Sequence, residues 1–210
     1  MANGSLQILI LYVDDMLVVG KDKHNVDALK EKLTDTFDMK NVCNASHILD
    51  MRIIRDRSRR LLYFSQQTYV EKVLKRFNME RGKSSSTSLA PHLKLSRANC
   101  PRSNAKKAEM AKVPYASVCG SLMYAMVATR LDIAFAVGVV SRFMSNLGKK
   151  HWEAVKRVLQ YLAGTKDKCI CFGKGKLSVV GYIDADFARD LDRRRSTSGY
   201  LYTFAGGAIS

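Results

Sequence analysis

Hydrophobic and polar residues near the start of the chain follow the pattern of short strands and then of a helix. Residues 6–13 form an apolar, β-branched and aromatic run, and after two aspartates residues 16–20 form a second one. Paired runs around a polar break predict a β-hairpin. Apolar side chains at helical spacing then predict a helix over about residues 25–37. The same two patterns predict a second hairpin and a further helix, at residues 48–64 and 65–77.

The pattern changes twice in the rest of the chain. Residues 82–112 are rich in Ser, Lys and Asn, which predicts a long loop or linker that acts as a hinge. Apolar stripes beyond it predict three helices and then three strands of one sheet, so the predicted fold class is α+β. The helices are expected at residues 115–128, 132–145 and 151–163, and the strands at residues 169–172, 177–187 and 199–205.

Composition narrows the class of protein. The 210 residues are 47% hydrophobic and 26% charged, as in a folded protein, and no apolar run is long enough to span a membrane. Five cysteines without a C-x-x-C pair argue against a disulfide framework or a zinc site and favour a reducing compartment. The net charge is +16, and residues 51–112 alone hold 16 Lys and Arg against 4 Asp and Glu. Such an excess favours a polyanionic partner such as nucleic acid, although a solvated surface is the alternative.

The sharpest chemical feature is the adjacent pair Asp14 and Asp15 at the tip of the first predicted hairpin. Mg²⁺ is a natural partner for such carboxylates, because it takes carboxylate oxygens together with substrate phosphates. The alternative is a turn in which the two aspartates only cap the hairpin. The long apolar runs on each side favour the metal, because they are expected to fix the hairpin in a core, where an unpaired charge is costly.

Residues 9–20 resemble the active-site hairpin of reverse transcriptases from copia-type LTR retrotransposons. Further ordered matches extend this resemblance along nearly the whole chain. They lie at residues 37–40, 76–79, 112–117, 120–125, 140–144, 151–156, 181–187 and 195–200.

The resemblance implies roles for the hairpin residues. Asp14 and Asp15 become two of the three polymerase carboxylates, and Tyr12 packs beside the primer end. Two Mg²⁺ (or Mn²⁺) ions would activate the primer 3′-hydroxyl and hold the triphosphate. The third carboxylate and the nucleotide-binding fingers belong to upstream segments of the family that these residues do not contain, so the two-metal site is expected to be incomplete.

The resemblance also implies partners and a nucleic-acid interface. The expected partners are an RNA template, a DNA primer, a dNTP and the remainder of the Pol polyprotein, with no membrane. An intracellular site is expected, in a cytoplasmic virus-like particle or the nucleus. Phosphate contacts to the template–primer duplex are expected from a basic set that comprises Arg55, Arg57, Lys72, Lys75 and Arg76. Arg193, Arg194 and Arg195 could do the same, or form a solvated turn.

A second catalytic centre is implied near the end of the chain. Asp184 resembles the first catalytic carboxylate of an RNase H domain. Asp186 is the weaker choice for that role, and the favoured interpretation of Asp186 and Asp190 is ordinary acidic surface. Further RNase H carboxylates would follow Ser210, so we expect a domain cut short and a truncated copy.

The resemblance also implies a division of the chain into four parts. These are a partial palm and thumb (1–81), a basic linker (82–112), a helical connection region (113–168) and the N-terminal strands of an RNase H-like domain (169–210).

The expected function is therefore that of a fragment of a retrotransposon reverse transcriptase with RNase H, whose reaction is RNA-directed DNA synthesis. We expect this fragment to lack polymerase activity by itself. The alternative is a catalytically dead, basic nucleic-acid-binding relic. Several turn positions depart from the family pattern, which is consistent with drift. Cys43 replaces a usual Gly, Arg189 replaces Gly after Ala188, and Leu131 and Leu147 replace usual Pro residues.

Overall fold

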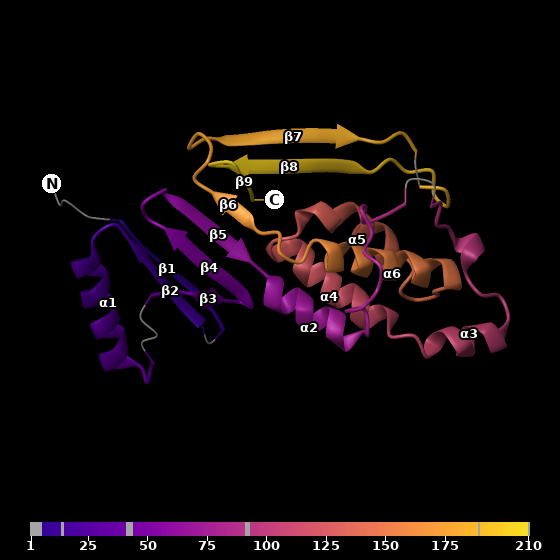
Figure 1. Ribbon diagram of the computed structural model, residues 1–210, viewed down its shortest axis with the longest axis horizontal. Helices are drawn as coiled ribbons and strands as arrows, with labels where there is room; N and C mark the ends of the chain where they lie inside the picture. The colour runs from indigo at the N-terminus through magenta and orange to yellow at the C-terminus, as the bar shows by residue number, and fades with distance from the viewer. Residues whose placement is uncertain (1–5, 14, 41–43, 91–92, 189, 210) are drawn as a thin grey trace. The chain divides into compact units, whose positions relative to one another are not determined.

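The computed structural model describes residues 6–13, 15–40, 44–90, 93–188 and 190–209 (Figure 1). The chain divides into two compact units, residues 1–49 and residues 50–210.

The first unit contains the predicted hairpin and helix. β1 (Gln7–Tyr12) and β2 (Asp15–Gly20) pair antiparallel, and their register runs from Gln7 opposite Gly20 to Tyr12 opposite Asp15. α1 (Lys23–Thr36) begins at Asp22, whose carboxylate accepts the backbone N–H of His24 at 2.9 Å. Such a cap satisfies a donor that has no partner within the helix. The short β3 (His47–Ile48) completes the unit.

The expectation that apolar runs fix this hairpin in a core is wrong. Side chains of β1 from Ile8 to Tyr12 are exposed, and α1 contributes no buried residue among those described. The physical reason is the small number of elements in the unit. One helix and one hairpin cannot cover both faces of a strand pair, so a β-branched run here indicates a strand without indicating burial.

The second unit begins with an antiparallel sheet. β4 (Met51–Asp56) and β5 (Leu61–Ser65) form the predicted second hairpin, and β6 (Ile170–Phe172) pairs with the other edge of β5. Phe64 and Phe172 lie on one face of this sheet and meet edge to face at 5.9 Å between ring centroids.

A separate sheet carries the last strands, in the order β7 (Val179–Ala185), β8 (Ser198–Phe204) and β9 (Gly207–Ala208). The prediction that residues 169–172 join this sheet is wrong, because β6 belongs to the sheet of β4 and β5. β6 pairs with β5 because the side chains of the two strands match, although the strands are far apart in the sequence. Leu62 and Phe64 of β5 lie opposite Phe172 and Ile170, which gives apolar neighbours on one face.

Helices form the core of the second unit (Figure 1). α2 (Gln67–Arg76), α4 (Tyr115–Ala128), α5 (Ala134–Ser141) and α6 (Lys149–Gly164) supply its buried side chains, and the one-turn η2 (Leu131–Ile133) links α4 to α5. The predicted helix over residues 132–145 is therefore a 3₁₀ turn followed by a shorter α-helix. Tyr115 is buried there and donates its hydroxyl to the carbonyl of Val140 at 2.7 Å.

The linker is not the structureless loop that its composition predicts. It contains the one-turn η1 (Arg97–Asn99) and the helix α3 (Asn104–Ala111). The Ser103 hydroxyl caps α3 by accepting the N–H of Lys106 at 3.4 Å, and alanines and lysines with good helix propensity follow it. The polar composition of residues 82–112 indicates a loop, although the helix propensity of residues 104–111 favours α3.

The mixture of helices and antiparallel sheets is consistent with the predicted α+β class. Within the described parts of the chain, every helix is too short or too polar to cross a lipid bilayer.

Candidate functional site

The first hairpin presents Tyr12 and Asp15 to solvent. They lie opposite each other at the end of the strand pair, where Val13 follows Tyr12, and both side chains are exposed. Val13 has a φ of +48°, as the favoured two-residue turns require, although a β-branched residue is strained in this region. Asp14, one of the two predicted metal ligands of this hairpin, lies outside the described residues.

Asp184 lies on β7, in the second unit. Its side chain is exposed, and its partner across the sheet is Gly199 of β8. Among the described residues, no three His, Cys, Asp or Glu side chains come close enough together to hold a metal ion. The roles predicted for Asp15 and Asp184 thus remain predictions.

The strongest grouping of predicted binding residues is on α2. Lys72, Lys75 and Arg76 are exposed. Lys75 and Arg76 follow Lys72 by three and four positions, so the three residues share the helix face opposite the buried Val70, Val73 and Leu74. Lys72 forms an exposed ion pair with Asp50 at 3.1 Å. Arg76 lies over the ring of Phe77 at 5.3 Å, which holds the guanidinium near the surface. We call these three residues the α2 basic face.

Arg55 and Arg57 lie away from the α2 basic face. Arg57 is in the turn between β4 and β5, whereas α2 follows the opposite end of β5. The carboxylate of Asp56 shapes that turn by accepting the Ser58 hydroxyl at 2.6 Å and the N–H of Arg59 at 3.0 Å. These bonds hold the pKa of Asp56 below its ordinary value. The predicted interface therefore has two separate parts, one at each end of β5.

Asp190 is not the ordinary acidic surface that the sequence suggested. Only 14% of its side chain is exposed, and it forms an ion pair with Arg142 at 3.1 Å. Backbone N–H groups of Asp192 and Arg193 donate to the same carboxylate, and with Arg142 they keep the pKa of Asp190 below its usual value. Asp186 is also engaged, because it accepts the N–H of Thr197 at 2.6 Å.

These two carboxylates line a pocket of about 480 Å³ between the linker, α5 and the segment after β7. Lys94, Arg142, Phe135 and Leu191 also line it. The carboxylates of Asp186 and Asp190 are already used in hydrogen bonds of the protein, so they stabilise this junction.

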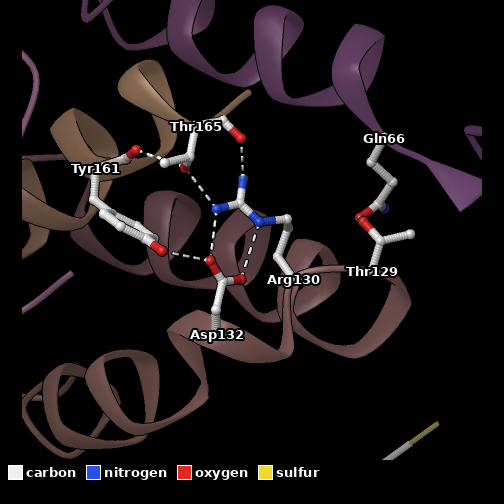
Figure 2. Close-up of polar contacts among 6 residues, drawn as sticks. All are labelled: Gln66, Thr129, Arg130, Asp132, Tyr161 and Thr165. Atoms are coloured by element: carbon white, nitrogen blue, oxygen red, sulfur yellow. Dashed lines mark hydrogen bonds and ion pairs between the residues drawn. The ribbon is translucent and has the colours of Figure 1, made fainter. Parts of the chain in front are cut away.

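A polar network that sequence reasoning missed surrounds the buried side chain of Arg130 (Figure 2). Its Nε and Nη2 atoms donate to the two carboxylate oxygens of Asp132 at 3.0 and 2.8 Å, and Nη1 and Nη2 also reach the carbonyl and hydroxyl of Thr165 at 3.0 and 2.6 Å. Tyr161 donates its hydroxyl to Asp132 at 2.7 Å. Burial acts to raise the pKa of Asp132, but the bonds from Arg130 and Tyr161 outweigh it and lower that pKa.

A second buried contact attaches α2 to the end of α4 (Figure 2). The hydroxyl of Thr129 donates to the side-chain carbonyl of Gln66 at 2.7 Å, and both residues are buried. Together, Thr129 and Arg130 fix the junction of α2, α4 and α6 that carries the α2 basic face. In the sequence they are a polar pair between two apolar helices, a pattern that indicates only the break between those helices.

Comparison with known proteins identifies the family. Residues 1–91 match the family model described as reverse transcriptase (RNA-dependent DNA polymerase). The chain is 59% identical over 203 residues to the Retrovirus-related Pol polyprotein from transposon TNT 1-94 of Nicotiana tabacum, a match that covers 97% of this chain and 15% of that protein. It is 36% identical to the Retrovirus-related Pol polyprotein from transposon RE2 of Arabidopsis thaliana, over 98% of this chain and 14% of that protein.

A shorter relative is covered over most of its length. The chain is 35% identical to an uncharacterized mitochondrial protein of Arabidopsis thaliana, over 94% of this chain and 78% of that protein. No solved structure matches the chain. The chain therefore belongs to the reverse transcriptase family, as a fragment of a copia-type retrotransposon Pol polyprotein, and this confirms the predicted resemblance.

Proposed function

We propose that this chain is a duplex-holding part of an RNA-directed DNA polymerase and that it does not extend primers by itself. It would bind an RNA–DNA duplex through the α2 basic face and the arginines near the β4–β5 turn. It would also place the hairpin carboxylates at the reaction centre. An RNA template, a DNA primer, a dNTP and the remaining Pol polyprotein would be its partners. Membership of the reverse transcriptase family supports this proposal.

The observation that carries the proposal is the α2 basic face. Three cations share one exposed helix face, and the opposite face is buried in the core. The buried contact between Gln66 and Thr129 holds the start of that helix against the end of α4. Lys and Arg displace condensed counterions when they meet a phosphate backbone, so a rigid row of cations suits a duplex better than a flexible one.

A divalent metal remains a proposal. Asp15 offers an exposed carboxylate beside the turn, and carboxylate oxygens are the ligands that Mg²⁺ prefers. Among the described residues, Asp15 is not part of any group of three His, Cys, Asp or Glu side chains that could hold a metal ion. We propose that Asp14 and Asp15 hold Mg²⁺ or Mn²⁺ only with a carboxylate from outside these 210 residues.

The arrangement into subdomains is proposed in the same sense. Residues 1–81 would form the end of the palm and the thumb, residues 82–112 a basic linker and residues 113–168 the connection. β7 and β8 would be the first strands of an RNase H-like sheet, with Asp184 as a metal ligand. The exposure of Asp184 on β7 supports this assignment. The assembled polyprotein would act in a cytoplasmic virus-like particle or in the nucleus.

The test is fluorescence anisotropy of a labelled RNA–DNA duplex at increasing salt. The chain should bind with a steep slope of log K against log salt, without added metal. Replacing Lys72, Lys75 and Arg76 together by Gln should reduce that slope by about 2 to 3, because each lost phosphate contact removes about 0.9.

A matched variant distinguishes this face from net charge alone. Lys168, Lys174 and Lys176 are exposed and lie outside the predicted interface, and their replacement by Gln removes the same charge. We expect this variant to bind with nearly the original slope. Equal losses in the two variants would refute a specific role for the α2 basic face, and no binding by the original chain would refute the proposed function.

A further inference from the structure

Residues 84–87, at the start of an acid-free segment of the chain, lie against α6. Residues 81–108 contain seven Lys and Arg and no Asp or Glu. The N–H of Ser85 donates to the carbonyl of Gln160 at 3.3 Å, and a Cβ atom on Gly164 would lie only 2.8 Å from the Cβ of Ser84. These contacts attach the hydroxyl-rich start of the segment closely to the helix.

Arg157 and Thr87 contact each other where this segment packs on α6, a contact region that we call the linker–α6 seam. Arg157 Nη2 donates to the Thr87 hydroxyl oxygen at 3.0 Å. Arg157 Nε is buried and has no hydrogen-bond partner among the described residues, and no ion pair found there involves Arg157. A buried, cationic donor without a partner costs free energy, so its persistence here needs an explanation.

Arg130 provides a comparison, because the edge of its guanidinium formed by Nε and Nη2 binds a carboxylate. The same two atoms, Nε and Nη2, donate to the two oxygens of Asp132 at 3.0 and 2.8 Å. In Arg157, Nη2 has one neutral hydroxyl as its partner and Nε has none, whereas in Arg130 the two atoms donate to two anionic oxygens. Thr87 is exposed, and its hydroxyl proton is not used in any hydrogen bond given by the described residues, so it can donate toward solvent.

We infer that Arg157 and Thr87 form an oxyanion site on the linker–α6 seam, and that its ligand is a backbone phosphate of nucleic acid. One phosphate oxygen accepts the Thr87 hydroxyl proton, and rotation of the exposed Thr87 side chain admits a second oxygen to the Nε–Nη2 edge. Bidentate Arg–phosphate pairing of this kind is strong and geometrically specific. The choice of nucleic acid rests on the proposed function, whereas the oxyanion site rests on the geometry of the seam.

The site itself is tested by titrating the full chain with inorganic phosphate against chloride at constant ionic strength. The readout is the ¹⁵N NMR signal of Arg157 Nε–H, assigned by its loss in Arg157→Lys. We expect a saturable shift of this signal, no shift of the Arg130 Nε–H signal, and an affinity several-fold weaker in Thr87→Val than in Thr68→Val, which alters an exposed threonine of α2. No shift at Arg157, or equal phosphate affinity in both threonine variants, would overturn the site.

The ligand is tested by the salt dependence of duplex binding. Arg157→Gln should reduce the slope by about 1. Lys149→Gln removes the same charge from α6 at a lysine that already pairs with Glu109 at 3.3 Å, and should leave the slope nearly unchanged. An unchanged slope in Arg157→Gln, with duplex binding intact, would overturn nucleic acid as the ligand. If the original chain does not bind the duplex, the proposed function is wrong. The phosphate titration would then still show whether the oxyanion site exists.

Discussion

Gly148 donates its backbone N–H to Nδ1 of His151 at 2.9 Å, at the start of α6. This bond fixes the neutral imidazole with its proton on Nε2, which donates to the carbonyl of Ser96 at 3.2 Å. The ring is fully buried and stacks on Phe143 with 4.0 Å between centroids. His151 thus attaches the linker turn η1 to α6 through both of its nitrogens.

Acid should weaken this attachment. Burial lowers the pKa of His151 in the folded chain, although the Ser96 carbonyl and the charge of Asp192 partly oppose that effect. A protonated ring would also turn Nδ1 into a donor that faces the N–H donor of Gly148. The neutral ring contributes its full stability above the ordinary pKa of 6.5, and this contribution declines as the pH falls below that value. The free energy of unfolding, followed by the fluorescence of Trp152, should therefore be lower at pH 5 than at pH 7.5.

The control for this pH dependence is a substitution that removes the titrating ring. His151→Asn should lower stability at pH 7.5 and flatten its change between pH 7.5 and pH 5. His24→Gln alters an exposed histidine and should leave the pH profile as it is. A profile that His151→Asn does not change would show that His151 is not the group responsible.

Gly148 should not accept a side chain. A Cβ atom there would lie 2.0 Å from the carbonyl oxygen of Asn99, which is backbone and cannot rotate away. Gly148→Ala should lower the free energy of unfolding by about 1–3 kcal/mol, the range for forced overpacking. Gly120 lies within α4 with no atom near its Cβ position, so Gly120→Ala should raise stability by about 0.5–1 kcal/mol. Urea denaturation of both variants measures the difference, and a stable Gly148→Ala chain would contradict this packing.

Loss of the Thr129 hydroxyl should leave Gln66 buried without its partner. Gln66 is 1% exposed, and its amide nitrogen already has no hydrogen-bond partner among the described residues. Thr129→Val keeps the shape of the side chain and should cost about 1–3 kcal/mol, the desolvation cost of an unsatisfied buried group. Thr68→Val, at an exposed position of α2, should change stability by less than about 0.5 kcal/mol. Equal costs in thermal unfolding would argue against this contact.

The turn of the first hairpin should gain stability from glycine. Val13 holds a φ of +48°, a conformation that costs a β-branched residue about 1–3 kcal/mol and that glycine adopts freely. Val13→Gly should slow hydrogen exchange at the amides of β1 and β2. Val19→Gly, within β2, should accelerate exchange, because glycine weakens a strand interior. Faster exchange in Val13→Gly would mean that the turn is not strained.

Local patterns in the sequence predicted the elements whose neighbours are close in the chain. The first hairpin, the pair β4 and β5, and the helices α4 and α6 follow from strand and helix periodicity over short windows. The pairing of β6 with β5 was missed because it joins residues about a hundred positions apart, and strand periodicity does not name a partner. α3 was missed because its polar residues resemble a loop, although their helix propensity is good.

The candidate site was predictable only where a short motif carries its chemistry. The apolar runs around Asp14 and Asp15 indicate a hairpin whose turn exposes a carboxylate, and Asp15 lies there. Arg130 gave no comparable signal, since its partners Asp132, Tyr161 and Thr165 are distributed over two elements that meet only in the folded chain. Charge predicted a polyanion as partner, but the separation of Arg57 from the α2 basic face required the structure.

We propose that this chain holds an RNA–DNA duplex and leaves catalysis to a carboxylate supplied from elsewhere. The most direct test is primer extension on poly(rA)/oligo(dT) with Mn²⁺, run beside a duplex-binding assay, for the chain and its Asp14→Asn variant. We predict salt-sensitive binding in both proteins and no nucleotide incorporation in either. Incorporation by the original chain that disappears in Asp14→Asn would contradict the claim, because the carboxylates of this chain would then suffice for polymerisation.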